Sequence, residues 1–336
     1  MKKQVLTGIK PTGRVHLGNY IGAIKPALDL AQNEYSETAY FVADYHGLTQ
    51  IHSCEEMKEL SYCIAATWLA LGLDHEKAIF YRQSDVPEIF ELSWILSCFA
   101  PKGLMNRAHA YKSIVESNQQ IGKDLDTGVN MGLFTYPILM AADILLFQTD
   151  LVPVGKDQVQ HVEIARDIAG NFNKQYGEVF HIPDYVIQEE SAVLPGLDGR
   201  KMSKSYQNTI PIFEEPKKLQ KLINKIKTDS SLPKEPKDPN SSIIFSLYKE
   251  FATSVQIEDL KEKFHSGIGW GEAKKELFHV MNAYLEEPRE KYYELMSSPK
   301  LLDEILEQGA LKARAKTIPF LEEVKQTIGI HRSSRI

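Results

Sequence analysis

The sequence predicts an α/β fold, in which a parallel sheet has helices on both faces and a smaller, mostly helical part follows it. In the first half of the chain, short apolar runs alternate with longer amphipathic stretches, an order that is typical of parallel sheets. After about residue 210 the strand-like runs disappear and the periodicity becomes helical. The length of 336 residues is enough for two domains.

The elements of the first half follow one another in order. The expected strands are 5–9, 38–43, 77–82 and 151–154. The expected helices are 17–32, 54–71, 87–99, 136–147 and 158–176. Pro137 would then sit in the first turn of its helix, where its missing N–H is tolerated. Ligands of parallel sheets bind at the carboxyl ends of the strands, so the loops that follow the strands are the expected site.

Composition excludes several classes of protein. The formal charge is 39 − 45 = −6, which argues against a uniformly basic nucleic-acid binder. Charge is nevertheless uneven: residues 200–240 carry 10 − 5 = +5 and residues 310–336 carry 6 − 2 = +4. These segments are either solvated helix faces or a surface that meets a polyanion.

Cysteine content and hydropathy give further limits. Three cysteines without a CxxC pair support neither a disulfide framework nor a sulfur-rich zinc site. The most apolar window, 60–73, is 14 residues long, too short to cross a bilayer. The first residues lack the apolar run of a signal peptide. We therefore expect a cytoplasmic protein without a membrane partner.

The first segment that could carry chemistry is the loop 11–19, between the first strand and the first helix. It holds the run His16-Leu17-Gly18-Asn19. Gly18 at a helix start would let a ligand approach the backbone, and free N–H groups there favour an anion. The alternative is an ordinary turn with its hydrogen bonds satisfied. Phosphate loops of the GxxxxGK[ST] type, GxGxxG, GxSxG and HExxH are absent from the sequence.

The second segment is Lys201-Met202-Ser203-Lys204-Ser205, in a loop led by Gly199. Two lysines flank a serine, and ammonium groups are suited to pyrophosphate as its charge develops. An ordinary basic surface loop is the alternative.

Together, HLGN and KMSKS resemble the paired signatures of the class I aminoacyl-tRNA synthetases. The first corresponds to the HIGH motif of that class, with Asn19 in place of the final histidine, and the second matches its consensus in all five letters. The order and separation of the pair are far more specific than either half. The resemblance implies a Rossmann-type, doubly wound parallel sheet of the HIGH/KMSKS nucleotidyl-transfer fold.

The run 136–146 indicates the amino acid. Residues Tyr136, Met140 and Asp143 share one helix face by their spacing. Met140 offers a flexible apolar surface to a large flat ring, where tyrosyl enzymes of the family are expected to have glutamine. Asp143 can accept a hydrogen bond from an indole N–H, which is only a donor. The alternative is that Met140 is core and Asp143 pairs structurally.

Further runs resemble the bacterial tryptophanyl-tRNA synthetases of this class over essentially the whole chain. They are Gly8–Gly13, Ala43–His46, Leu139–Leu146, Val152–Gln158 and Gly309–Arg314. The resemblance implies ATP and Mg²⁺, with the ion held mainly by ATP phosphates and by no protein metal site. It also implies L-tryptophan, tRNA(Trp) and a homodimer.

The resemblance also implies roles for individual residues. The catalytic residues would be His16, Asn19, Lys201, Ser203 and Lys204. The ATP-binding residues would be Lys10, Pro11, Thr12, Gly18, Asn19, Gly155, Lys156, Asp157, Val193, Lys201, Met202, Ser203, Lys204 and Ser205. The tryptophan-binding residues would be Asp143, Thr7, His46, Tyr136, Met140, Val152, Val154 and Gln158.

The same resemblance implies a division into domains. A Rossmann catalytic domain would cover 1–210, with an insertion at about 101–127. A helical domain that binds the tRNA anticodon would cover 211–290, and a C-terminal helical segment, 291–336, would pack back on the core.

Some positions depart from the family pattern. Ile114 stands where a second phosphate-facing lysine is expected beside Lys112. Pro319 would kink or end the last long helix. The alternatives to a tryptophan–tRNA ligase are a tyrosyl-tRNA synthetase, a non-catalytic RNA-binding paralogue and a small-molecule nucleotidyltransferase.

Overall fold

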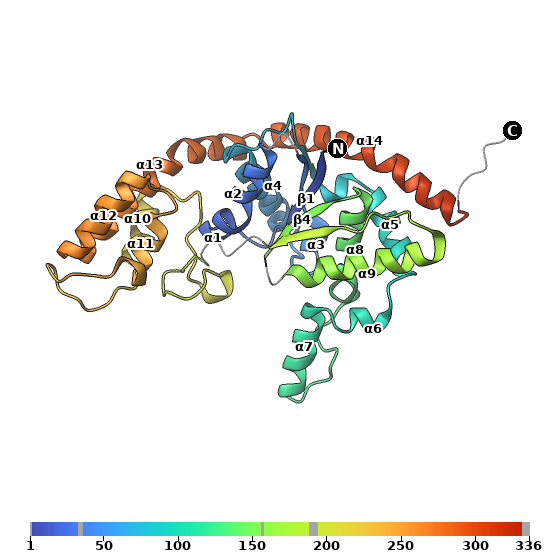
Figure 1. The fold of residues 1–336 in the computed structure, drawn as a ribbon, viewed down its shortest axis with the longest axis horizontal. Coiled ribbons are helices and arrows are strands. Elements are labelled where there is room, and N and C mark those ends of the chain that lie inside the picture. Colours follow the sequence, from blue (N-terminus) through green and yellow to red (C-terminus); the bar gives the residue numbers. More distant parts are fainter. Residues whose placement is uncertain (1, 33–35, 156–157, 188–193, 331–336) are drawn as a thin grey trace.

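In the computed structural model, residues 2–32, 36–155, 158–187 and 194–330 are described. This part of the chain forms a five-stranded parallel sheet in the order β3-β2-β1-β4-β5, which confirms the predicted α/β class (Figure 1). The strands are β1 (Lys3–Ile9), β2 (Ser36–Val42), β3 (Ile79–Arg82), β4 (Leu151–Val154) and β5 (Asp184–Ile187). β5 was not predicted, because it is short and largely exposed and so lacks an apolar run.

The strand order reverses at β1. The chain builds β2 and β3 on one side of β1, and then places β4 and β5 on the other side. In sheets of this kind ligands bind outside the carboxyl ends of the strands at such a reversal. The loops after β1, β2 and β4 therefore meet at the expected site.

Helices cover both faces of the sheet, and β2 shows how. Its side chains alternate, so that Tyr40 and Val42 enter one apolar core while Ala39 and Phe41 enter the other. The first core contains α1 (Leu17–Asn19), the π-helical η1 (Tyr20–Ile24), α2 (Lys25–Ala31) and α4 (Cys54–Ala70). The second contains α5 (Glu88–Ser97), α8 (Met131–Leu146) and α9 (Val159–Tyr176).

Helix α8 begins five residues earlier than predicted. The Asn130 side chain accepts a hydrogen bond from the backbone N–H of Leu133 and so caps the helix at Met131. Pro137 consequently lies inside the helix, and its predicted place in the first turn is wrong. The face that carries Tyr136, Met140 and Asp143 is unaffected by this shift.

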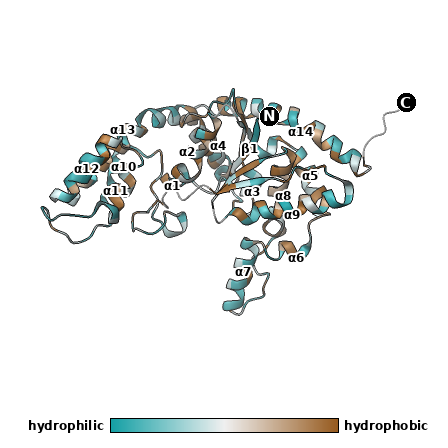
Figure 2. Ribbon diagram, in the orientation of Figure 1, coloured by the Kyte–Doolittle hydropathy of each residue, from teal (hydrophilic) through white to brown (hydrophobic). Residues whose placement is uncertain are grey.

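The predicted insertion contains α6 (Lys102–Met105) and α7 (His109–Gln120). Helix α7 projects from the body of the molecule (Figure 1). The residues of α7 are largely hydrophilic, whereas those of α8 are largely hydrophobic (Figure 2). Within the described residues, no helix has the length and apolar character needed to cross a membrane.

The second half of the chain is helical. After η4 (Lys204–Tyr206), a lobe beyond one end of the sheet is formed by α10 (Pro216–Asn224), η5 (Pro239–Ser241), α11 (Ile243–Tyr248) and α12 (Ser254–Ser266) (Figure 1). The long helix α13 (Trp270–Met296) leads from this lobe back to the sheet and packs on α4. The last helix, α14 (Pro299–Thr327), then packs against β3.

Helix α14 does not end at Pro319, so the prediction of a helix end there is wrong. The residues after the proline, Phe320, Leu321 and Val324, are buried in the second core. Their burial offsets the lost backbone hydrogen bond, because tertiary packing outweighs the local propensity of one residue.

Candidate active site

The loop after β1 is organised by its histidine and asparagine. Nδ1 of His16 accepts a hydrogen bond from the backbone N–H of Asn19 at 3.3 Å. The Asn19 side-chain oxygen accepts one from the backbone N–H of His16 at 3.2 Å, which completes a reciprocal cap at the start of α1. A Cβ at Gly18 would lie 3.1 Å from the His16 ring, so this glycine lets the ring pack on the helix. The loop is therefore rigid where the first signature stands.

The second signature lies against this loop, although the two are separated by about 180 residues. Nζ of Lys204 donates a hydrogen bond to the carbonyl oxygen of Thr12 at 3.3 Å. Backbone bonds also join the segments, from Leu17 to Ile210 at 2.9 Å and from Ile212 to Val15 at 3.1 Å. The structure thus places the cationic loop directly on the loop that follows β1.

The charged groups at this junction suit the binding of an anion. Partial burial of the ammonium groups lowers the pKa of both Lys10 and Lys204, although the Lys204 side chain as a whole is exposed. Burial, together with the nearby Lys204 ammonium, lowers the pKa of His16 to about 4. His16 is therefore a neutral group near pH 7, and a nearby phosphate would meet lysine charge and a neutral imidazole.

Asn208, which the sequence reasoning missed, holds the KMSKS segment. Its side-chain oxygen accepts a hydrogen bond from the backbone N–H of Ser203 at 2.8 Å. Its amide group donates to Oδ1 of Asp198 at 2.7 Å and to the carbonyl oxygen of Lys201 at 3.1 Å. Hydrogen bonds from Asn208 and Arg200 lower the pKa of Asp198 to about 2. Met202 is buried, while Lys201, Lys204 and Ser205 are exposed.

The predicted tryptophan residues gather around Asp143 of α8, which packs on the face of the sheet opposite to α1. This carboxylate is 1% exposed, and Nε2 of His46 lies 2.9 Å from its Oδ2. Gln83 donates to both carboxylate oxygens, at 2.8 and 2.9 Å. Burial raises the pKa of Asp143, and the hydrogen bonds from His46 and Gln83 oppose that shift. Asp143 is therefore a buried carboxylate with fixed donors, as the cost of burying it requires.

Tyr136 continues this group of side chains along α8. Its ring meets the edge of His46, with 6.3 Å between centroids, and Nζ of Lys10 lies 5.8 Å from the centre of its ring. Its hydroxyl lies 2.5 Å from Nε2 of His161, and Nδ1 of His161 lies 2.8 Å from the Gln158 side-chain oxygen. His161 thus joins two of the predicted tryptophan residues.

The remaining predicted residues lie around the same strands. Val152 and Val154 are buried on β4, and Met140 packs against the second core at its edge. Thr7 lies on β1, and its hydroxyl is buried without a hydrogen-bond partner among the described residues. Gly155 follows β4, whereas Lys156, Asp157 and Val193 lie outside the described residues.

Sequence reasoning missed Gln83 and His161 as well as Asn208. Gln83 directly follows β3, so its position at the carboxyl end of a strand was a usable signal. His161 lies one helical turn after Gln158, on the same face of α9. Lys112, in contrast, pairs with Glu116 at 3.6 Å on the projecting helix α7, which also carries Ile114.

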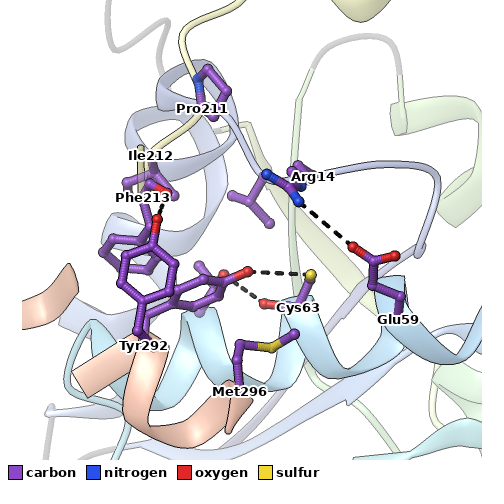
Figure 3. A pocket seen from close by; sticks show the side chains of 11 residues that line it. Arg14, Glu59, Cys63, Pro211, Ile212, Phe213, Tyr292 and Met296 are labelled. Atoms are coloured by element: carbon purple, nitrogen blue, oxygen red, sulfur yellow. Dashed lines mark hydrogen bonds and ion pairs between the residues drawn. The ribbon is translucent and has the colours of Figure 1, made fainter. Parts of the chain in front are cut away.

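A separate cavity of about 130 Å³ lies where α4, α13 and residues 211–213 meet (Figure 3). None of the residues predicted to bind ATP or tryptophan lines it. The Tyr292 hydroxyl donates to Sγ of Cys63 at 3.2 Å inside it, and Arg14 lies at its wall, 3.6 Å from Glu59. The cavity therefore belongs to the junction between the sheet and the helical lobe.

Comparison with known proteins identifies the family of the chain. The profile of the family described as tRNA synthetases class I (W and Y) matches residues 2–286. A tryptophan–tRNA ligase of Neisseria meningitidis is 53% identical, and the alignment covers 98% of each chain. One from Pseudomonas putida is 51% identical over 98% of this chain and 74% of its own.

Solved structures give the same relationship in three dimensions. Tryptophanyl-tRNA synthetase from Campylobacter jejuni, complexed with ADP and tryptophan, superimposes with a TM-score of 0.89 at 47% identity. That alignment covers 97% of this chain and 99% of the other. A tyrosyl-tRNA synthetase from Archaeoglobus fulgidus shares the fold, with a TM-score of 0.63 at 22% identity.

Proposed function

Since the chain belongs to the class I tRNA synthetases for tryptophan and tyrosine, we propose that it is a tryptophan–tRNA ligase. It activates L-tryptophan with ATP and transfers it to the terminal adenosine of tRNA(Trp). The observation that carries the choice of amino acid is the face of α8, where Met140 stands one turn from the buried Asp143. Relatives about half identical over nearly the whole chain are named for the same activity.

The tryptophan pocket that we propose lies between β1, β4 and α8. Met140 contacts the flat face of the indole, and Val152 and Val154 form its apolar wall. Asp143 accepts the indole N–H, for which a buried acceptor is worth most. Tyr136 and Gln158, joined through His161, bind the polar end of the amino acid, while Thr7 and His46 complete the pocket.

The ATP site that we propose lies where the two signatures meet, on the face of the sheet opposite to α8. Residues Lys10–Thr12 and Gly18–Asn19 line it from the loop after β1. Lys201, Ser203 and Lys204 contact the triphosphate, flanked by Met202 and Ser205. The family resemblance assigns Gly155, Lys156 and Asp157 to the nucleotide, with Asp157 at the ribose hydroxyls, and Val193 to the adenine. Near neutral pH, His16 contributes an uncharged imidazole beside these phosphates.

Magnesium is expected to enter with ATP. Among the described residues, no cluster of three or more His, Cys, Asp or Glu side chains could hold a metal ion. A site built of lysines and neutral donors fits an ion that is held by phosphate oxygens. When bound, the ion screens negative charge on the phosphates.

The reaction follows from this arrangement. The tryptophan carboxylate attacks the α-phosphorus of ATP, the bond to the β-phosphate oxygen breaks, and pyrophosphate leaves as tryptophanyl-adenylate forms. A ribose hydroxyl of the terminal tRNA adenosine then attacks the activated carbonyl, and AMP leaves. The chain accelerates the first step by positioning its two substrates and by placing lysine charge where pyrophosphate develops.

The helical units serve the tRNA in this proposal. Residues 1–210 form the catalytic domain, with the insertion at 101–127. Residues 211–290 contact the anticodon, and 291–336 return to the core. The surplus of positive charge in 200–240 fits a polyanionic partner such as tRNA. We propose that this reaction takes place in the cytoplasm.

A second copy of the chain is proposed to pack on the surface near α5. On α5, Trp94 is 74% exposed and lies one turn after Phe90. The ring centroid of Phe90 lies 4.3 Å from that of Tyr45 in α3 (Asp44–Gly47). Large apolar side chains that gather at the surface in this way are typical of an interface. We propose a homodimer, with Trp94 at its contact.

The test is ATP–pyrophosphate exchange on the purified protein, run with each of the twenty amino acids and without tRNA. Exchange with tryptophan alone supports the proposal. Exchange with tyrosine would keep the fold and overturn the pocket. Absence of exchange with every amino acid would favour an RNA-binding paralogue or another nucleotidyltransferase.

A further inference from the structure

Gln83 is one of three side chains that meet at the centre of the proposed tryptophan pocket. It is fully buried and begins the 3₁₀ turn η2 (Gln83–Asp85), directly after β3. Both oxygens of Asp143 lie within hydrogen-bond distance of its amide nitrogen, at 2.8 and 2.9 Å. His46 contacts only one of those oxygens.

The turn that carries Gln83 is held on both sides. Ser84 donates twice to Asp44, from its hydroxyl at 2.5 Å and from its backbone N–H at 3.1 Å. Arg82, the preceding residue, donates to Asp303 of α14 at 2.6 Å. The Gln83 amide therefore has a fixed position. The Asp143 carboxylate that it bonds is ordered before the substrate arrives, so the carboxylate loses little entropy on binding.

We propose that Gln83 is the positioning residue for the amino acid: it orients the Asp143 carboxylate and holds it ionised, so that the carboxylate can accept the indole N–H of tryptophan. The inference rests on the proposed function. In this proposal Gln83 acts through Asp143 and does not itself contact the substrate.

The charged state of Asp143 is set by groups from three elements. From α3, His46 bonds to the carboxylate and favours its charged form, whereas the nearby Asp44 carboxylate disfavours it. From η2, Gln83 favours the charged form. From β3, the fully buried Tyr81 phenol lies near Asp143. Burial, and then the Asp143 charge, raise the pKa of that phenol. Removing the Gln83 amide removes one of the two hydrogen-bonding side chains that oppose the effect of burial on the pKa of Asp143.

The experiment compares Gln83→Met with Gln83→Glu in tryptophan-dependent pyrophosphate exchange across pH. Methionine keeps the length of the side chain but cannot donate. We expect the KM for tryptophan to rise on the order of tenfold, because a hydrogen bond to a charged group is lost, while the KM for ATP stays unchanged. The acid limb of the kcat/KM profile for tryptophan should move to higher pH.

The Gln83→Glu variant should behave in the opposite way. Two carboxyl groups in contact cannot both ionise easily, so the introduced carboxyl group and that of Asp143 would share one proton as the pH falls. The protonated glutamate side chain can then donate to the Asp143 carboxylate as glutamine does. The defect of Gln83→Glu should therefore shrink at acidic pH, where that of Gln83→Met grows.

Gln4→Met is the matched control. Gln4 is also a buried glutamine, but it lies at the start of β1, where its amide donates to the carbonyl oxygen of Glu37 at 3.3 Å. It should change thermal stability and leave the pH profile for tryptophan unaltered. Equal losses in Gln83→Met and Gln83→Glu at every pH, or an unchanged tryptophan KM in both, would overturn the inference. Failure of the parent protein to exchange with tryptophan would instead overturn the proposed function.

Discussion

Gly309 of α14 lies directly on the backbone of Phe80 in β3. A Cβ atom built at Gly309 would overlap the carbonyl oxygen of Phe80, which is backbone and has little freedom to move. The last helix can therefore approach the sheet only because this position lacks a side chain. Nearby, Asp303 of the same helix accepts hydrogen bonds from Arg82 and Tyr62, so α14 is held to the end of β3.

Gly309→Ala should destabilise the protein, although alanine is the better helix former. The methyl group would push α14 away from β3, and overpacking of this kind costs about 3 kcal/mol. Urea unfolding measures the effect. Gly170→Ala is the control, because a Cβ at Gly170 in the middle of α9 meets nothing within 4 Å. That change should stabilise by up to about 1 kcal/mol. Equal effects of the two substitutions would contradict the close approach of α14.

Asp143→Ala should impair the use of tryptophan far more than the use of ATP. The substitution removes the proposed acceptor of the indole N–H and leaves the donors of His46 and Gln83 without their acceptor. We expect kcat/KM for tryptophan in pyrophosphate exchange to fall on the order of 10²-fold or more. The KM for ATP should change little, because the signatures and α8 pack on opposite faces of the sheet.

The control for this prediction is Asp150→Ala. Asp150 accepts a hydrogen bond from the backbone N–H of Gln4 at 2.7 Å, at the opposite end of the strands. Its loss should reduce stability without a selective effect on tryptophan. Unchanged tryptophan-dependent exchange in Asp143→Ala would remove Asp143 from the site.

His16 should make the stability of the protein depend on acid. Its pKa is about 4 in the folded chain, against 6.5 for a free histidine. Between these values the unfolded chain binds a proton that the folded chain excludes, so stability is lost as the pH falls through this window. In His16→Asn this group no longer titrates, and urea unfolding should show a smaller loss between about pH 7 and about pH 4.5.

Lys204→Met gives a second readout of the same pair. The Lys204 ammonium is one of the two causes of the low pKa of His16, burial being the larger. Its removal should raise the pKa of His16 in an NMR titration of the imidazole ring. A His16→Asn variant with the pH dependence of the parent protein would show that the imidazole is not held neutral.

The sequence predicts those parts of the fold that have a strong apolar period. The four strands with apolar runs and the helices between them lie within a few residues of their expected positions. β5 escaped prediction because it is exposed, and the start of α8 was missed because Asn130, and no apolar residue, sets it. The periodicity of apolar residues indicates which face is buried, but it does not indicate where a helix begins when a single capping hydrogen bond sets that point.

The same limit applies to the site. Residues inside the two signatures and on the α8 face could be named from the sequence, since spacing and type mark them. Asn208 was missed because it lies in an irregular loop, where it bonds to Asp198 without any periodic pattern. Gln83 and His161 had only a positional signal, after β3 and one turn after Gln158. Their partners, Asp143 and Tyr136, are distant in the sequence. Such pairs become visible only when the fold brings their segments together.

Tyr292→Phe should weaken the junction between α13 and α4. The Tyr292 hydroxyl donates to the buried thiol of Cys63 across the cavity shown in Figure 3, and burial raises the pKa of that thiol, so it stays protonated and neutral. Removing the hydroxyl should cost about 1 kcal/mol in urea unfolding, the usual value of one buried hydrogen bond.

Tyr293→Phe is the matched control. Its hydroxyl donates to the carbonyl oxygen of Phe213 at 3.2 Å, but the side chain is 44% exposed and water can replace the bond. Tyr293→Phe should therefore cost less than Tyr292→Phe, and the reverse order would show that the bond to Cys63 adds nothing to the stability of the junction.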